Sequence, residues 1–136
     1  MNNEVNDPDN SSLIRVLIIS DRLPERVNEL EDYFKNKENF EVAGIAEDKE
    51  EALSIARNHN FEYLIIVGYL KDERNYTLIE ELKKMHKNFL TVQWSMIDSL
   101  IISFCIRYKI PLKFERTLPL DDFADFLMQH KKSIGL

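Results

Sequence analysis

The sequence predicts one doubly wound α/β domain, in which a five-stranded parallel sheet carries helices on both faces. Two observations predict it. Short, nearly continuous apolar runs alternate five times with segments whose apolar residues recur at helical spacing. The chain has 136 residues, which is the size of one ordinary domain. Because parallel strands need crossover connections, this alternation indicates right-handed βαβ units.

The first half of the chain supplies two strand–helix pairs. Residues 13–20 (LIRVLIIS) are largely β-branched and apolar, as in a central strand that is covered on both faces. A helix is expected over 24–37, because its first residue is proline and apolar residues then recur at helical spacing. Residues 40–46 (FEVAGIA) form the second strand, and Asp48 with Glu51 has the spacing of a capping box that begins the second helix.

The second half supplies three more pairs of the same kind. The expected strands are 63–67 (YLIIV), 89–94 (FLTVQW) and 112–115 (LKFE), and the helices that follow them cover 78–85, 97–108 and 120–130. In a doubly wound sheet, the side chains that bind ligands or react gather at the carboxyl ends of the strands. The candidate functional residues are therefore those that follow each strand.

Charge and composition exclude several classes of function. The 18 basic and 24 acidic residues give a net charge of −6, which argues against direct binding of nucleic acid. The single cysteine, Cys105, excludes an intramolecular disulfide and a zinc site made of cysteine pairs. No apolar stretch approaches the roughly 18 residues that span a bilayer, so we expect no membrane association and a cytoplasmic protein. Residues 1–12 are polar and turn-forming, so we expect a disordered tail before a domain over 13–136.

The order of these segments resembles the receiver domain of bacterial two-component response regulators, from Leu13 to His130. VLIISD is similar to the family's first strand with its acidic pair, and FEVAGIAEDKEEALSIA to its second strand and helix. YLIIVG is similar to the strand that ends in the phosphoacceptor aspartate, and KIPLKFERT to the stretch that ends in a Lys-Pro dipeptide. The resemblance implies a flavodoxin-like fold and a role in signalling.

The resemblance also places residues of this chain on the family's phosphorylation pocket. Ser20 and Asp21 fall on the two acidic metal-binding positions, so one carboxylate is retained. Gly68 falls on the phosphoacceptor. Ser95 falls on the hydroxyl residue that senses the phosphoryl group, and Arg116 on the lysine that clamps it. The resemblance therefore implies a degenerate pocket in which the central residue has changed.

Two further positions depart from the family, and the chemistry of phosphoryl transfer weighs against the site. Lys113 falls where the family usually has an aromatic residue, and Thr117 on the proline after the lysine. Aspartyl phosphorylation needs an oxygen nucleophile and a Mg²⁺ ion. Gly68 supplies no side-chain atom, and Asp21, beside the cationic Arg22, would hold the metal nearly alone. We expect no metal, no cofactor and no catalytic residue.

The polar residues of the degenerate pocket have two further interpretations. Asp21 can form an ion pair with Arg116 or Arg22, or cap the helix that follows it. Alternatively, Arg116, Ser95 and the backbone N–H groups around Gly68 can form a small pocket for an anionic ligand.

The helix expected over 97–108 has apolar residues almost all the way round, whereas a surface helix normally has one apolar stripe. The resemblance makes it the fourth helix, which the family uses for dimerisation and partner docking. We therefore expect an interface, of a homodimer or with a protein partner, on this helix, the short strand after it and the last helix. The alternative is a helix buried within its own domain, with Cys105 as an inert thiol. The candidate interface residues are Ile97, Leu100, Ile101, Ile102 and Cys105.

Together these observations predict a pseudo-receiver, a non-catalytic signalling module that acts through protein–protein interaction without phosphorylation. Two alternatives stay open: the receiver domain of a truncated response-regulator transcription factor, and a sensor of a small anionic ligand. A nucleotide enzyme on the same scaffold has little support, because Gly44, Gly68 and Gly135 are too far apart to form a phosphate loop.

Overall fold

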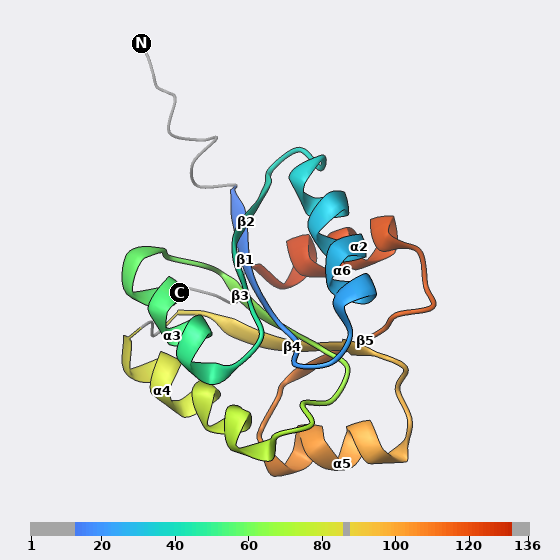
Figure 1. Cartoon of the computed structure of the whole chain (residues 1–136). Helices are drawn as coiled ribbons and strands as arrows, with labels where there is room; N and C mark the ends of the chain where they lie inside the picture. Colours follow the sequence, from blue (N-terminus) through green and yellow to red (C-terminus); the bar gives the residue numbers. More distant parts are fainter. Residues whose placement is uncertain (1–12, 86–87, 132–136) are drawn as a thin grey trace.

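The computed structural model describes residues 13–85 and 88–131, and it confirms the predicted fold class. All five strands are parallel, in the order β2-β1-β3-β4-β5. Figure 1 shows α2 and α6 on one face of the sheet and α3, α4 and α5 on the other. The predicted tail at residues 1–12 lies outside the described residues.

The strands and helices match the predicted segments closely. The strands are β1 (Ile14–Ile19), β2 (Phe40–Ala46), β3 (Tyr63–Val67), β4 (Leu90–Ser95) and β5 (Leu112–Glu115). The helices are α2 (Pro24–Lys35), α3 (Lys49–Asn58), α4 (Leu78–Met85), α5 (Ser99–Arg107) and α6 (Leu120–His130), and a 3₁₀ turn, η1 (Glu73–Thr77), precedes α4.

The ends of two helices show how local sequence sets their boundaries. The Asp48 carboxylate accepts a hydrogen bond from Glu51 N at 2.8 Å, as the capping-box spacing predicts. The Glu51 carboxylate reaches back to Glu47 N at 2.7 Å, one residue earlier than in a standard capping box. Helix α5 begins two residues later than predicted, because Asp98 is its N-cap and accepts from Ile101 N at 2.9 Å.

Each face of the sheet has its own apolar core. Under α2 and α6, the side chains of Leu30, Phe34 and Phe123 are fully buried against the sheet. Trp94, the chain's single tryptophan, is buried there too and stacks on Phe123 with ring centroids 6.1 Å apart. The opposite core joins α3, α4 and α5 to the other face of the sheet. Within the described residues, no helix is both long and apolar enough to cross a bilayer.

Candidate functional site

The predicted pocket residues converge on the carboxyl edge of the sheet. Ser20 follows β1, Gly68 follows β3, Ser95 ends β4 and Arg116 follows β5. Backbone hydrogen bonds continue between these ends, from Gly68 N to Trp94 O at 3.1 Å and from Arg116 N to Ser95 O at 3.0 Å. The connections from β1 and β3 run to opposite sides of the sheet, so this edge is the topological switch point at which such folds bind ligands.

Gly68 has a backbone that few other residues tolerate. Its φ is +70°, in the left-handed region where a residue with a Cβ is strained. A Cβ at this position would lie 2.7 Å from Cδ1 of Leu23, so the Leu23 side chain occupies the space that a side chain at 68 needs. Position 68 therefore has no cavity for a larger side chain.

Gln93, which sequence reasoning did not single out, holds Gly68 in place. It lies on β4 and is fully buried. Its Nε2 donates to the Gly68 carbonyl and, at 3.4 Å, to Ser95 Oγ. The Ser95 hydroxyl donates to Met96 O at 3.3 Å. Among the described residues, Gln93 Oε1 has no hydrogen-bond partner. The signal for Gln93 in the sequence was a polar residue within an apolar strand.

Asp21 binds neither of the arginines that the sequence analysis offered as partners, and it does not cap α2. Its two carboxylate oxygens accept from the loop after β3, from Lys71 N at 2.9 Å and Asp72 N at 3.1 Å. Asn75 Nδ2 adds a third bond at 3.3 Å, and Asn75 Oδ1 accepts from Lys49 N at 3.0 Å. Those two expectations were wrong because backbone amides from a neighbouring loop reach the carboxylate. Asp21 thus ties together the loops that follow β1, β2 and β3.

The remaining cations of the pocket lie apart from Asp21. Arg22 stacks over the ring of Tyr69, 4.4 Å from its centroid. The Arg116 side chain has no hydrogen-bond or ion-pair partner in the part of the chain that the structure describes. Ser20, which is buried, accepts from Leu23 N at 3.3 Å. The predicted anion pocket of Arg116, Ser95 and the amides near Gly68 stays a prediction.

Strand β5 carries one predicted pocket residue, Lys113, which is exposed and pairs in register with Gln93. It also carries Glu115, which sequence reasoning missed. Glu115 accepts from Ile97 N at 3.0 Å through one carboxylate oxygen and from Thr117 Oγ1 at 3.3 Å through the other. Glu115 therefore holds the loop between β4 and α5 against the sheet edge.

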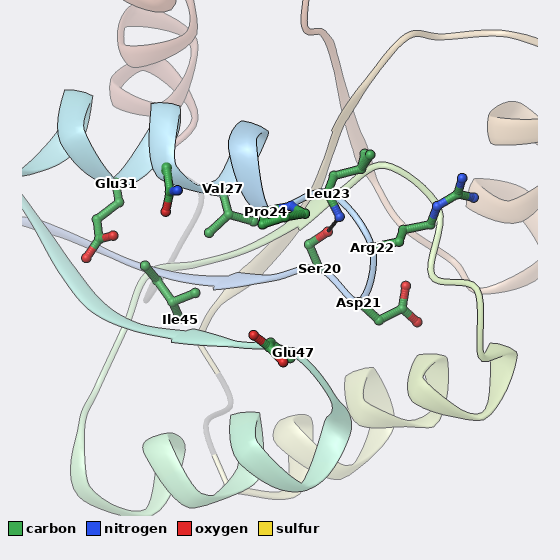
Figure 2. Close-up of a pocket in the computed structure, with 10 residues that line it drawn as sticks. Ser20, Asp21, Arg22, Leu23, Pro24, Val27, Glu31, Ile45 and Glu47 are labelled. Atoms are coloured by element: carbon green, nitrogen blue, oxygen red, sulfur yellow. Dashed lines mark hydrogen bonds between the residues drawn. The ribbon is translucent and has the colours of Figure 1, made fainter.

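A cavity of about 420 Å³ opens beside this edge, between α2 and the end of β2. Figure 2 shows Val27 and Pro24 of α2 on one side, Ile45 and Glu47 on the other, and Ser20 at the inner end. Three carboxylates line this cavity, those of Asp21, Glu31 and Glu47. The Glu31 carboxylate forms an ion pair with Lys35 Nζ at 2.7 Å. Among residues 13–85 and 88–131, no group of three or more His, Cys, Asp or Glu side chains is placed to hold a metal ion.

The structure divides the candidate interface residues between two sides of α5. Ile101 and Cys105 are 4% and 3% exposed, so they belong to the core and cannot contact a partner. Their assignment to an interface was therefore wrong, because both lie on the face of the helix that packs against the core. Burial also raises the pKa of the Cys105 thiol, as expected for an inert cysteine.

The outer side of α5 remains open. Leu100 and Ile102 are 49% and 41% exposed, and Ile106, which was not a candidate, is 74% exposed. Ile97 is half-buried against the core under α5. The alternative of a helix buried all round within its own domain is therefore wrong.

An aromatic stack joins α5 to the loops at the pocket. The Phe104 ring lies 6.0 Å from Tyr69 and 5.5 Å from Tyr76, nearly parallel to both. Tyr76 and Tyr108 stack with centroids 4.1 Å apart and planes 4° apart. Glu73 fixes the end of this stack, because it accepts from Tyr108 OH at 2.7 Å and from Arg107 at 3.1 Å.

The whole arrangement is similar to solved receiver domains. A CheY-like receiver domain protein from Methanospirillum hungatei JF-1 is 19% identical, with a TM-score of 0.64 over 90% of this chain and 96% of that one. The receiver domain of an HD domain-containing protein from Pseudomonas fluorescens Pf-5 is 14% identical, with a TM-score of 0.70 over 89% and 98%.

A third likeness is to a protein described as pilus assembly-related, from Burkholderia pseudomallei K96243. It is 16% identical, with a TM-score of 0.71 over 92% of this chain and 94% of that one. No protein-family profile matches the sequence, and no curated protein matches it. These likenesses show the receiver-type fold.

Proposed function

We propose that this chain is a pseudo-receiver, a non-catalytic signalling module that keeps the receiver fold, accepts no phosphoryl group and works by binding a protein partner. The observation that carries the proposal is Gly68. It has no nucleophilic atom, its φ of +70° disfavours any other residue, and Leu23 fills the adjacent space. Gly68 therefore offers no atom to phosphorylate, and its backbone and Leu23 both oppose a side chain there.

The bonds of Asp21 support the same proposal. In a working site a carboxylate here would be one of the ligands of Mg²⁺, which prefers oxygen donors. The Asp21 oxygens instead accept from Lys71 N, Asp72 N and Asn75 Nδ2. A cation would have to displace these donors, and the residue before Asp21 is a serine with no charge to assist it.

The outer side of α5 is the surface through which the module would act. Ile102 and Ile106, one turn apart on this helix, expose neighbouring apolar side chains, and Leu100 is exposed further round the helix. Exposed apolar patches on a small domain are typical of protein–protein contacts. The occupant is either a partner protein or a second copy of the chain in a homodimer.

The direct test is incubation with Mg²⁺ and acetyl phosphate, followed by mass spectrometry of the intact protein. We expect no added phosphoryl group, while a receiver domain that has the aspartate gains one under the same conditions. A phosphoryl adduct that is released by hydroxylamine, as acyl phosphates are, would overturn the proposal. Mapping the adduct to a residue would then identify the carboxylate that replaces the missing one.

A further inference from the structure

A second hollow in the molecule lies away from the degenerate pocket, between α4 and the last turn of α5. Its volume is about 320 Å³. The α4 side contributes Ile79, Glu80 and Lys83, and the α5 side contributes Tyr108 and Lys109. Arg107 lies at its rim beside Tyr108. This α4–α5 groove is within the size range of pockets that bind small ligands or a few side chains.

The charge of the groove is opposite to that of the whole chain. The chain carries a net −6, yet the groove is lined by Lys83, Lys109 and Arg107 against a single acidic side chain, Glu80. Arg107 is already paired with Glu73 at 3.1 Å. In the described part of the chain, neither Lys83 nor Lys109 forms an ion pair. Two uncompensated ammonium groups therefore face the same hollow.

The backbone of Lys109 closes the end of α5. Its φ is +58°, in the left-handed region that favours glycine. The helix end closes through bonds from Lys109 N to Ile106 O at 3.4 Å and from Ile110 N to Cys105 O at 2.9 Å. This bond pattern is an ordinary helix C-cap, and it places Lys109 directly after the last turn of α5, where it lines the groove.

The wall of the groove is flat, aromatic and rigid. Tyr108 stacks on the buried Tyr76 with planes only 4° apart. Glu73 holds the Tyr108 hydroxyl at 2.7 Å, so the ring cannot swing without losing this bond. Ile79, which is also buried, completes the apolar part of the lining. A ring or other flat apolar group can pack here while a neighbouring anion meets the lysines.

We propose that the α4–α5 groove binds an acidic segment of a partner protein, in which a carboxylate neighbours an aromatic side chain. This inference rests on the proposed function, since it names the chemistry of the partner. Separate carboxylates fit better than a polyphosphate, because Glu80 lines the groove and Glu73 binds Arg107, which also lines it. Both acidic side chains would repel concentrated negative charge.

The test uses backbone amide NMR of the full chain with a capped Glu-Phe-Glu tripeptide as the probe. We expect saturable shifts at the amides of Lys83, Tyr108 and Lys109. Capped Lys-Phe-Lys should cause none, and capped Glu-Ala-Glu should bind more weakly. Absence of shifts at these amides up to the solubility limit, or equal shifts with the cationic peptide, would overturn the proposal. Stronger shifts with adenosine monophosphate would replace the peptide by a nucleotide and overturn it as well.

Two variants separate binding from folding. Lys83→Glu and Lys109→Gly should each weaken peptide binding roughly two- to fivefold, as expected for loss of one exposed ion pair. Lys109→Gly should also raise the melting temperature, because glycine accepts a left-handed φ. The matched control is Asn39→Gly, which relieves a second left-handed non-glycine residue, with φ of +70°, outside the groove. It should leave binding unchanged.

Unchanged affinity in both lysine variants would contradict the groove assignment. These results are independent of the phosphorylation assay. An acyl phosphate in that assay would remove the proposed function without changing which amides the peptide shifts. Failure of the peptide to bind would remove the groove assignment and leave the missing phosphoacceptor as it stands.

Discussion

Around Gly68 the side chains of Ser20, Asp21 and Ser95 are hydrogen-bonded within the protein, whereas the outer side of α5 leaves Leu100, Ile102 and Ile106 exposed to solvent. At the pocket, Asp21 binds loop amides and Gln93 holds the Gly68 carbonyl. The first region stabilises the domain through its own contacts. The second has apolar surface that only another molecule can cover. The two regions therefore differ in where their contacts lie, within the chain at Gly68 and open to solvent at α5.

The largest loss of stability is expected for a substitution at Gly68, in the first of these regions. Gly68→Ala should lower the free energy of unfolding by about 2–4 kcal/mol, because it adds a strained left-handed residue and a clash with Leu23. Urea unfolding measures it. Combining it with Leu23→Ala should recover the part of the loss that is due to the clash.

Gly44→Ala is the matched control for this substitution. A Cβ at Gly44 would lie 2.7 Å from the Ile55 side chain, but Gly44 is absent from the positive-φ positions. Three Ile55 atoms lie within 3.1 Å of that Cβ, so the clash is larger at Gly44, and the cost of Gly44→Ala is steric alone. Ile55→Ala should recover most of that cost, whereas Leu23→Ala should leave the strain part of the Gly68→Ala loss. Full recovery by Leu23→Ala would mean that the backbone of Gly68 is not strained.

The next largest loss of stability is expected for Asp21→Asn. It replaces one of the two carboxylate oxygens that accept hydrogen bonds from the loop after β3. We expect a loss of about 1–3 kcal/mol, the typical cost of leaving a donor unsatisfied. Asp72→Asn in the same loop is the control. It removes an exposed ion pair with Arg74, while asparagine can still accept from Arg74 N as the N-cap of η1. Its effect should therefore stay within about 0.5 kcal/mol. A stability gain in Asp21→Asn without Mg²⁺ that is reversed when Mg²⁺ is added would indicate that the carboxylate is held for a cation.

The aromatic stack that connects the two regions should respond to alkaline pH. Burial raises the pKa of Tyr76 from 10.0 to about 12. Above pH 10 the tyrosine ionises in the unfolded chain before it does in the folded one, so stability is complete below this pH and falls between pH 10 and about 12. Tyr76→Phe should flatten that fall in urea unfolding. An unchanged slope would show that Tyr76 does not contribute to it.

The smallest effect on stability, with a visible effect on assembly, is expected on the outer side of α5. Ile106→Glu and Ile102→Glu should change the free energy of unfolding by less than about 0.5 kcal/mol, because both side chains are exposed. They should shift the sedimentation of any homodimer towards the monomer. Ile101→Glu, at a position that is 4% exposed, should instead unfold the domain. A monomer that is unchanged by the exposed substitutions would argue against self-association.

The strands, the helices and the position of Gly68 were predictable because apolar runs mark their own boundaries. The contacts that fill the pocket were not. Leu23 and Gly68 are far apart in the chain, and nothing in the residue types indicates which side chain enters the vacated space. For Asp21, the sequence favoured partners of opposite charge, whereas the structure supplies backbone amides, which every residue other than proline has.

The side of α5 that faces outward was also only partly predictable. Its apolar residues go round the helix, so composition predicts a second contact but not its position. The start of the helix at Asp98 and its packing through Ile101 and Phe104 set that position. As a result, two candidate residues proved to be core, and Ile106, the most exposed apolar side chain of the helix, was overlooked.

The burial of Trp94 under α6 gives the molecule an intrinsic fluorophore. As the chain's single tryptophan, 1% exposed and stacked on Phe123, it should emit at short wavelength while α6 is docked and shift to the red when that helix departs. Because α5 lies across the sheet, ligands that bind there should leave the emission colour unaltered. The emission wavelength of Trp94 should therefore report unfolding and not binding at α5, without any added label.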